Sequence, residues 1–582
     1  MRSLRNIGRQ AEAPASPVGD WQVTRSPALP QAKAPAPLRV ALAALFAVAP
    51  TWSQATQVQG PITPRGRVEL EPFQEVQIPL RAGVAGQYPV TLQRVIERVL
   101  ANNPDLQIAR IAREEADDNV TASEGYYDPV VGFEAHRSRA ETPIASLIGG
   151  SASGRLTQAE LDFNPVMNGS SPWWGGTYNL TFANSRTQTD STFATLNPQY
   201  PTSLNLNLTQ PLWRGLRIDD ARYRLQVARK NTGLSAEQLR QRVIEVVTQA
   251  VEYYWELDFA VENLEVQTQA VRLAEDQRAS NRRQADQGIL APIDVVAAQT
   301  QIATFEQNLF TAQQALTTAE NNLKTLMAAG ASDPIWNMAL APETEPDLNV
   351  VPPAVDEALK RALTSRPELS ENLISREING LQVQLNREAT KPRVDAVATL
   401  ISAGLAGTPQ ALPAFAGFSF SGTPLPPILY GTYGQSLSNL TSGNFATAKI
   451  GVQVSLPLRN RTAEANLSVA VAEKRRLDVQ RSQLEMAIEA DVRNALGLVS
   501  SARARYDAAI EASRYAQEQY DSEQRQFQAG TSTVFLVLQR QTDFIAARSR
   551  EVRARADLAE SIANLDRATA RTIDTYQISL AP

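Results

Sequence analysis

The chain of 582 residues contains no cysteine and a single histidine, His136. Without cysteine it has no disulfides, no thiol chemistry and no place for an N-terminal lipid on cysteine. One histidine without a second ligand gives poor support for a metal site. The sequence also lacks a Ser–His arrangement and a glycine loop that would cradle phosphate. We therefore expect no catalytic activity, no cofactor and no metal.

Long apolar runs and a basic charge are also lacking. The formal net charge is −5, whereas proteins that bind nucleic acid usually carry a basic surface, so we expect no nucleic-acid partner. Mean hydropathy is −0.27. The longest apolar run, Val40–Ala49, is shorter than the roughly 20 residues that a membrane-spanning helix needs. These numbers exclude a protein built from many membrane-spanning helices.

The short apolar run has the features of an export signal. Arg39 precedes it, and Ser53 and Ala55 follow it with the spacing of a signal-peptidase site. We predict that residues 1–55 are a signal peptide with an N-terminal extension, cleaved after Ala55. The alternative is a short buried helix. Residues 56–87 would then form an N-terminal periplasmic segment.

Two long stretches favour helix over their whole length. Residues 216–287 and 462–528 each contain no proline and one glycine. Apolar residues recur three or four positions apart, which places them in one stripe along a helix with a period typical of coiled coils. At 1.5 Å per residue each helix would reach about 100 Å. Helices of this length are not the core of a compact globule.

Each long stretch ends at a glycine, Gly288 or Gly530, and a second helical stretch follows it. These second stretches lie near residues 293–328 and 534–570. Glycine tolerates the positive φ that a turn between antiparallel helices often requires. The sequence therefore predicts two helical hairpins with tight turns.

Alternating apolar and polar residues precede both long helices. Residues 203–215 and 448–460 have this period of two, which predicts strands with one apolar and one polar face. Residues 130–138 and 394–402 also have the character of strands. The stretches between the strands are rich in Gly, Ser, Thr, Asn and Pro and are expected to be loops, at 141–201 and 403–447. A further strand at 177–185 stays open.

One structural unit occurs twice in the chain. Two segments open with a residue, a proline, an acid and leucine, as "NPDL" from Asn103 and as "RPEL" from Arg366. In both, a second proline follows 25 residues after the first and marks the entry to a strand. The predicted divisions are a first structural repeat at 88–330, a linker at 331–352, a second structural repeat at 353–572 and a C-terminal tail at 573–582.

These elements predict a membrane protein of mixed α+β class. Strands with one apolar face can cross a bilayer only if they close into a barrel, because every backbone polar group must be paired there. Four strands are too few to enclose a lumen, so several chains must contribute. The long helices would continue from such a transmembrane β-barrel as a coiled-coil tunnel.

The motifs resemble those of TolC-like outer-membrane efflux proteins, the outer membrane factors. The resemblance rests on the two "[NR]P[DE]L" openings, the strand exits "QPLWRG" and "LPLRN", and the stretch "FQAGTSTVFLVLQRQ". The order of these features is repeated in the two halves, and the resemblance covers about residues 88–572. It implies a homotrimer in the bacterial outer membrane, surrounded by lipid, with about four strands per subunit in a barrel of about 12 strands. It also implies a helical tunnel in the periplasm that docks on a periplasmic adaptor protein and an inner-membrane pump.

The function implied by the resemblance is a passive exit channel of a tripartite efflux pump or a type I secretion system. The alternative from the residues is an exported coiled-coil scaffold without a pore. In the resembling family the two glycine turns are periplasmic tips, where the tunnel closes and the adaptor binds. The carried-over residues are Gln287, Gly288, Ile289 and Leu290 at one tip, and Ala529, Gly530, Thr531 and Ser532 at the other. A purely turn-forming role for the glycines is the alternative.

Three residues are candidates for the channel constriction. Asp294 lies six residues beyond Gly288, where the resemblance implies an acid; three copies near one axis would favour cations. The alternative role is an acid that stabilises a helix N-terminus. Leu536 and Phe527 stand where the family can carry an acid and a tyrosine, so a polar lock cannot form here in the same way. We predict that closure relies on the packing of Phe527, Leu536 and their copies.

Overall fold

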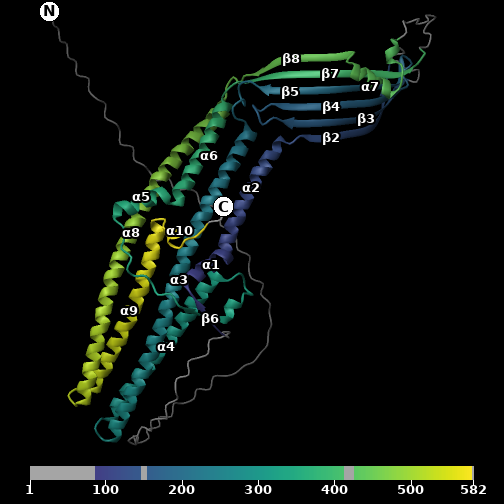
Figure 1. The fold of residues 1–582 in the computed structure, drawn as a ribbon. Helices are drawn as coiled ribbons and strands as arrows, with labels where there is room; N and C mark the ends of the chain where they lie inside the picture. Colours follow the sequence, from purple (N-terminus) through teal and green to yellow (C-terminus); the bar gives the residue numbers. More distant parts are fainter. Residues whose placement is uncertain (1–85, 146–153, 412–424, 580–582) are drawn as a thin grey trace, which may run out of the picture. The chain divides into compact units, whose positions relative to one another are not determined.

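The structure is a computed structural model that describes residues 86–145, 154–411 and 425–579 (Figure 1). All of these residues fall within one unit, Val76–Pro582. The predicted signal peptide, residues 1–55, and nearly all of the predicted segment 56–87 lie outside the described residues.

Both halves of the chain contain two short helices, a first strand, a last strand, a very long helix and a second helix of the hairpin, in this order, and they differ in what lies between the first and last strands. The first half contains α1 (Leu92–Asn102), α2 (Pro104–Glu124), η1 (Gly125–Tyr127), β2 (Val130–Pro143), β3 (Arg155–Ser170), β4 (Thr177–Thr189), β5 (Leu196–Pro211), α3 (Asp220–Asp286) and α4 (Pro292–Met327). The second contains α5 (Val355–Ser365), α6 (Pro367–Ala389), β7 (Arg393–Pro409), η4 (Pro427–Leu429), α7 (Tyr433–Ser442), β8 (Phe445–Ser455), α8 (Arg461–Gln528), α9 (Val534–Ala568) and α10 (Thr572–Thr575). The two predicted long helices are confirmed as α3, of 67 residues, and α8, of 68 residues.

The repeated proline frame marks the start of a helix in each half. Pro104 and Pro367 occupy the first positions of α2 and α6, where the missing N–H costs nothing because it would have no partner in the helix. At α2 the side chain of Asn103 accepts hydrogen bonds from the backbone N–H groups of Asp105, at 3.0 Å, and Leu106, at 3.2 Å. These bonds satisfy two of the donors that a helix N-terminus leaves free.

The described strands other than β1 and β6 form one antiparallel sheet of six strands in the order β2-β3-β4-β5-β7-β8. The expectation of four strands per subunit is therefore wrong for this chain. Strands β3 and β4 lie in the stretch 141–201 that was expected to be loop, and the open segment 177–185 is the greater part of β4. Strand β7 also continues through Pro409, and α7 lies in the second expected loop, 403–447.

The alternation of apolar and polar residues that predicts a strand is present in β3, but the composition around it favours a loop. Leu161, Phe163 and Met167 alternate with Asp162 and other polar residues, which is the period of a strand. Turn-forming residues dominate the composition of the surrounding stretch, and a proline interrupts the strand itself. Composition therefore predicted a loop for this segment. In the structure it forms a strand because it pairs with β2 on one side and β4 on the other.

A small parallel sheet ties the N-terminal part of the described chain to the segment between the repeats. Strand β1 (Gly86–Val90) pairs with β6 (Met338–Pro342), which follows η3 (Pro334–Asn337) within the segment predicted as a linker. The buried hydroxyl of Tyr254 on α3 donates to the carbonyl of Val90 at 3.2 Å and accepts from the N–H of Thr344 at 2.9 Å. One side chain thereby fixes the segments on both sides of this sheet against α3.

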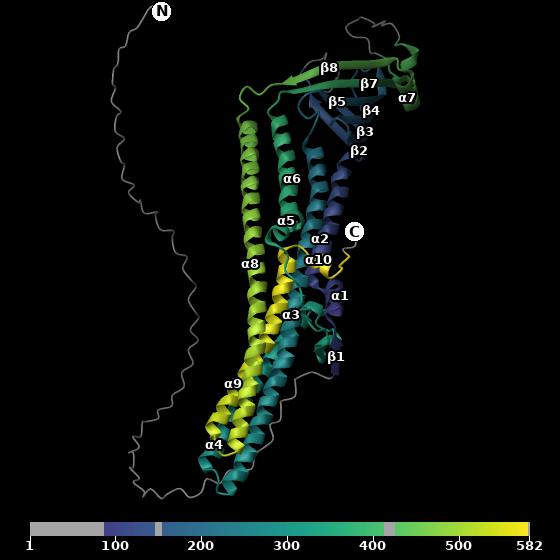
Figure 2. The same ribbon diagram turned by 60° about the vertical axis from the view of Figure 1, so that its left-hand side comes forward.

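The helices pack as two hairpins that meet along α3 and α9 (Figures 1 and 2). Helix α3 runs against α4, and α8 runs against α9. The two hairpins are joined by ion pairs such as that between Arg555 and Asp258, with 2.7 Å between the guanidinium and carboxylate groups. Among the described residues, no helix combines the length and apolar character needed to cross a membrane.

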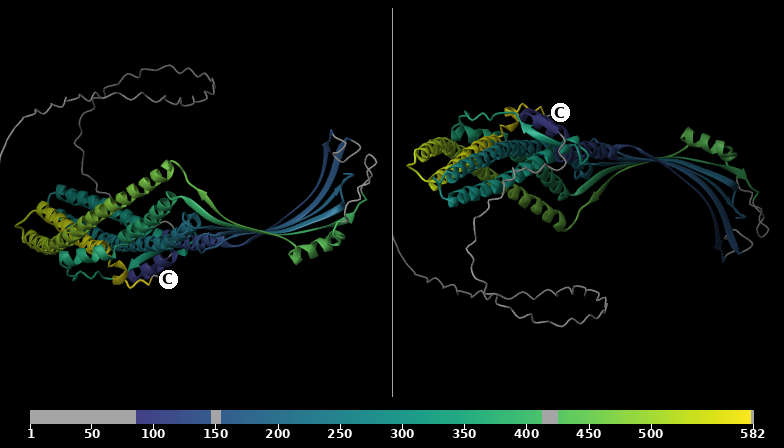
Figure 3. Two further views of the ribbon diagram at one scale, coloured as in Figure 1. Left: turned by 90° about the horizontal axis from the view of Figure 1, so that it is seen from above. Right: turned by 90° about the horizontal axis from the view of Figure 1, so that it is seen from below.

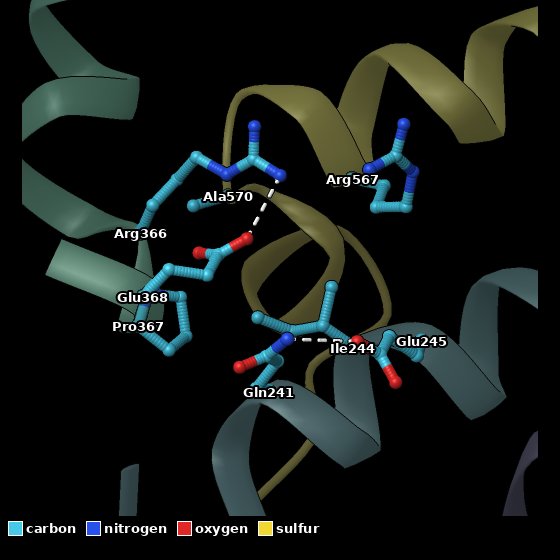
Figure 4. A pocket seen from close by; sticks show the side chains of 8 residues that line it. All are labelled: Gln241, Ile244, Glu245, Arg366, Pro367, Glu368, Arg567 and Ala570. Carbon is cyan, nitrogen blue, oxygen red and sulfur yellow. Dashed lines mark hydrogen bonds and ion pairs between the residues drawn. The ribbon is translucent and has the colours of Figure 1, made fainter. Parts of the chain in front are cut away.

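A cluster of charged side chains occupies the junction of α3, the start of α6 and the end of α9 (Figure 4), and Asp491 of α8 joins it through ion pairs. Arg366, just before α6, contacts Asp491 of α8 at 2.8 Å and Glu368 at 3.0 Å, and Arg567 of α9 contacts Asp491 at 3.1 Å. Burial opposes ionisation of Asp491, but hydrogen bonds from the two arginines hold its pKa below the usual value. Elements distant in sequence therefore share one acid.

Glu371 lies one turn beyond Glu368 on α6. Its Oε1 atom is buried and has no hydrogen-bond partner. Burial, together with the charges of Glu368, Glu237 and Glu245, raises the pKa of Glu371 to about 7. The folded state therefore retains a proton that the unfolded chain releases near its ordinary pKa of 4.5.

We predict that Glu371→Gln makes stability less dependent on pH. A raised carboxyl pKa stabilises the fold at low pH, and this contribution is lost as pH rises from about 4.5 through about 7. The thermal midpoint of the native chain should fall over this window, and the fall should be smaller in Glu371→Gln. Glu377→Gln, on the exposed side of α6, is the matched control. Equal slopes in all three proteins would contradict the prediction; Glu560, whose pKa is also raised to about 7, leaves a residual slope in each.

Candidate channel wall and helical tips

One face of the six-stranded sheet carries an apolar band that crosses all six strands, and beyond this band the same face carries charged residues such as Arg137 and Arg186. Its side chains follow the alternation of each strand, and the register places one residue from every strand in the same row. One such row contains Val131, Met167, Leu180, Leu206, Leu400 and Ala448. The sheet forms a single curved layer (Figure 3). An apolar row that crosses all six strands is the arrangement that a lipid-facing wall requires.

The opposite face is polar, and its side chains are hydrogen bonded across strands. Asn179 of β4 donates to the side-chain oxygen of Asn168 of β3. Asn207 of β5 donates to Asn179 at 3.4 Å, and Thr399 of β7 donates to Asn207 at 2.9 Å. This ladder joins four neighbouring strands, so the face that would meet water has a defined side-chain arrangement.

The single histidine also lies on the polar face. His136 of β2 places its Nε2 atom 2.8 Å from the carboxylate of Asp162 on β3, its directly paired residue. Glu134 is the other acid within reach, at 4.0 Å. In the part of the chain that the structure describes, no group of three or more His, Cys, Asp or Glu side chains is arranged to hold a metal ion.

Helix α7 covers the end of the apolar face that is remote from the long helices. The hydroxyl groups of Thr202 and Ser436 lie 2.9 Å apart, and Ser402 donates to the carbonyl of Leu440 at 2.6 Å. Gly404 permits this approach, since a Cβ atom there would lie 2.1 Å from the carbonyl oxygen of Ser436. The uncovered apolar band is therefore bounded at this end by a helix with polar contacts.

The opposite end of the sheet carries exposed tryptophans. Trp173 and Trp174 occupy the turn between β3 and β4, and Trp213 follows β5 on the way into α3. The side chain of Gln210 donates to the carbonyl of Trp174 at 2.9 Å, which holds the turn against β5. Tryptophan at the end of an apolar band is typical of a membrane–water interface.

The two glycine turns have the same geometry. Gly288 has a φ of +75° and Gly530 a φ of +77°. After each glycine, the next N–H donates to the carbonyl five residues earlier: Ile289 to Gln284 and Thr531 to Gln526, both at 2.9 Å. This pattern defines the Schellman motif that ends a helix. The predicted tight turns are confirmed, and the glycines have a structural role whatever else the tips do.

The two tips contact each other through apolar side chains. Leu290 from the first tip packs against a cluster in the α8–α9 hairpin. The buried members of that cluster are Tyr520, Phe527, Val534, Val537 and Leu538. Phe527 is only 8% exposed, so its ring belongs to the core of its own hairpin. Leu536 lies on another side of α9 and is 37% exposed.

The remaining tip residues are placed separately from this cluster. Asp294 occupies the first turn of α4, where its N–H donates to the carbonyl of Ala291 at 3.0 Å. Ser532 donates to the carboxylate of Glu523. The structure thus brings Leu290 and Phe527 together, but Asp294 and Leu536 lie outside their apolar cluster. Sequence reasoning missed Tyr520, whose ring stacks on Phe544 at 6.0 Å and which precedes Phe527 by two helical turns.

Comparison with known proteins agrees with this architecture. The family model for outer membrane efflux proteins matches residues 175–329 and 358–571. No curated protein matches the chain.

Three solved structures are among those with a similar fold. The outer-membrane channel OprN has 15% identity and a TM-score of 0.58, and the match covers 82% of this chain and 89% of that one. The CmeC outer membrane channel of Campylobacter jejuni has 16% identity and a TM-score of 0.56, covering 83% and 86%. The outer membrane protein VceC of Vibrio cholerae has 16% identity and a TM-score of 0.56, covering 82% and 95%.

At 15–16% identity the solved structures support the fold alone. The family match covers parts of both repeats and more than half of the chain, so it shows the family. The match begins within the turn that precedes β4 and ends just beyond α9. The chain therefore belongs to the outer membrane efflux protein family and is a protein of the bacterial outer membrane.

Proposed function

We propose that this protein is the passive outer-membrane exit channel of a tripartite efflux pump or a type I secretion system. The observation that carries the proposal is the two-faced sheet continued by two long helical hairpins. Its apolar rows suit lipid, and its asparagine and threonine rows suit a water-filled lumen. A coiled-coil scaffold without a pore would have no use for an uncovered apolar sheet face.

The proposed assembly is a homotrimer. Within the described residues neither β2 nor β8 has a strand partner along its outer edge. Unpaired backbone groups are costly in lipid, so both edges must be closed by other copies of the chain. The exposed Trp173, Trp174 and Trp213 would mark the periplasmic interface of the membrane, because the strands enter the long helices at that end.

The proposed partners are a periplasmic adaptor and, through it, an inner-membrane pump. The contact surface would be the two tips, Gln287–Leu290 and Ala529–Ser532. Ile289 supports this assignment because it is 68% exposed at the tip of a hairpin, where an apolar side chain gains from a partner that covers it. The adaptor would supply apolar helical surface at this position. No catalytic group is part of the proposal.

The proposed gate combines the three constriction candidates. Leu536 is exposed on α9 and would meet its copies near the channel axis. Phe527 would act indirectly, since it holds α8 against α9 within its own hairpin. Asp294 would add a ring of like charges close to the axis, which favours cations.

Labelling of introduced cysteines tests the channel topology, because the native chain has no background thiol. Ser191→Cys lies in the turn between β4 and β5, at the end of the sheet remote from the helices, and Ala529→Cys lies at the second tip. In intact cells, a membrane-impermeant maleimide should label Ser191→Cys at once. It should label Ala529→Cys only after the outer membrane is opened. Labelling of Ala529→Cys from outside would contradict the proposed topology and favour the scaffold.

Electrical recording tests the apolar gate. Leu536→Ala should raise the resting conductance of the reconstituted channel, because it removes apolar surface where the copies meet. Phe527→Ala should also raise it, and in addition should lower the thermal midpoint, because truncating a buried phenylalanine costs about 3–5 kcal/mol. Thr311→Ala, on the exposed side of α4 away from the tip, is the control. Resting conductance that is unchanged in both tip variants would rule out this gate.

The reversal potential under a salt gradient tests the role of Asp294. Asp294→Asn should reduce the preference for cations if three carboxylates surround the axis. If the carboxylate serves only the N-terminus of α4, selectivity stays the same and stability falls by about 0.3–1 kcal/mol. Asp286→Asn, at the end of α3, is the matched control for loss of one exposed tip charge.

A further inference from the structure

We propose that the hairpin β3–β4 is part of the membrane wall, so that three copies of this chain build a barrel of 18 strands. The proposal rests on the channel function and the trimer described above. It concerns a feature that the resemblance did not imply, namely two additional strands per subunit. Its consequence is a lumen wider than the predicted four strands per subunit would give.

Because the hairpin pairs with strands on both sides, β2 and β5 do not pair directly with each other. Strand β2 pairs with β3 from Val130↔Asn168 to Pro143↔Arg155, which is its whole length. Strand β4 pairs with β5 from Thr177↔Thr209 to Thr187↔Gln199. Three inter-strand spacings therefore separate β2 from β5, or about 14 Å. Taking the hairpin out of the wall would break both ladders and expose their backbone groups.

The side chains of the hairpin follow the two faces of the rest of the sheet. On β3, Phe163 and Met167 point to the apolar face, and Phe163 is 52% exposed, so this chain does not cover it. Asp162 and Asn164 point to the polar face. A hairpin that stood in water beside the barrel would have no reason to keep this alternation. A hairpin in the wall requires it, with lipid on one side and the lumen on the other.

The internal repeat shows how the sheet can continue into the next copy. Strand β5 of the first repeat pairs with β7 of the second, and their counterparts by element order are β8 and β2. These counterparts are the two free edges of the sheet. The helices show the same relation as the strands. Helix α3 of the first repeat packs on α6 of the second, and their counterparts by element order, α8 and α2, form the corresponding outer pair. The copy that follows would then place its β2 beside β8.

The same reasoning gives a register for this contact. Matching Pro129 with Pro392 and Pro211 with Pro457 superimposes the strand entries and exits of the two repeats. The pair Leu208↔Ala398 then corresponds to Val454 opposite Ala135 of the partner subunit. Both residues belong to the apolar face and are exposed in the single chain. The transferred register therefore keeps lipid-facing side chains on one side across the subunit boundary.

The extra strands change the size and lining of the lumen. Barrel diameter grows roughly linearly with strand number, so 18 strands in place of 12 enlarge the cross-section about twofold. The hairpin also adds Glu160 and Asp162 to the polar face in every copy. The membrane part of this duct would therefore accept bulkier solutes than the predicted barrel of 12 strands, and its added polar side chains are mostly uncharged.

Fluorescence quenching on matched rows tests whether the hairpin lies in the wall. Met167→Cys on β3 and Leu206→Cys on β5 share one apolar row. Val166→Cys on β3 and Asn205→Cys on β5 share the neighbouring row, which lies on the polar face of the sheet. Each single variant of the full chain is labelled with an environment-sensitive fluorophore and reconstituted in lipid. The quenchers are a nitroxide attached to the lipid chains and iodide in water.

The expected result is that each β3 label behaves as the β5 label in its row. Lipid nitroxide should quench the labels at Met167→Cys and Leu206→Cys to a similar extent, and iodide should reach those at Val166→Cys and Asn205→Cys. If iodide quenches both β3 labels while the β5 labels keep the wall pattern, the hairpin lies outside the wall and the proposal is overturned. If the β5 labels also escape the lipid quencher, the proposed channel function itself fails.

Native mass spectrometry and cross-linking complete the test. The full chain extracted in detergent should contain three copies; two copies would give a closed wall of 12 strands and overturn the count of 18. On oxidation, Val454→Cys combined with Ala135→Cys should form a covalent trimer. Val454→Cys combined with Glu134→Cys, on the opposite face, should yield at least tenfold less. Equal yields from the two pairs would overturn the transferred register.

Discussion

The pairing of β5 with β7 joins the two repeats into one sheet, and the rest of the described fold depends on it. The ladder runs from Leu196↔Pro409 to Pro211↔Asp395, with one irregularity near Leu196. Because β5 leads into α3 and β7 follows α6, this ladder also sets α3 beside α6. The remaining strands add on either side, so that the free edges fall at β2 and β8. A duplicated unit therefore becomes a continuous surface that further copies can extend.

The need to pair backbone groups in lipid explains why the insertion in this sheet is a hairpin of two strands. Every backbone polar group in the bilayer needs a partner, and each strand must present alternate side chains to lipid and to water. A hairpin adds two antiparallel strands, so β5 still returns the chain to the end where α3 begins. A single extra strand would leave the chain at the wrong end of the sheet. The apolar row through Val131, Met167 and Leu180 shows that the inserted strands obey the same rule as their neighbours.

The helical part combines local and long-range constraints. At the tips, glycine in the left-handed region completes the same Schellman motif in both hairpins, so the turn is encoded by a few adjacent residues. At the junction of α3, α6, α8 and α9, Asp491 binds two arginines, Arg366 and Arg567, that are far from it in sequence. The first constraint fixes where each hairpin ends, and the second fixes how the hairpins meet. An apolar contact through Leu290 joins the hairpins again at the tips.

The sequence by itself determined the long helices, their glycine turns and the duplication. These features follow from local rules: the period of apolar residues, the absence of proline, and the tolerance of Gly288 and Gly530 for positive φ. Tertiary structure decided that 155–189 joins the sheet, because strand formation there depends on partners in β2 and β5 rather than on composition. It also decided that Phe527 is a core residue of its hairpin while Leu536 remains exposed. Which face of a helix is covered depends on helices elsewhere in the chain, and periodicity alone does not name that partner.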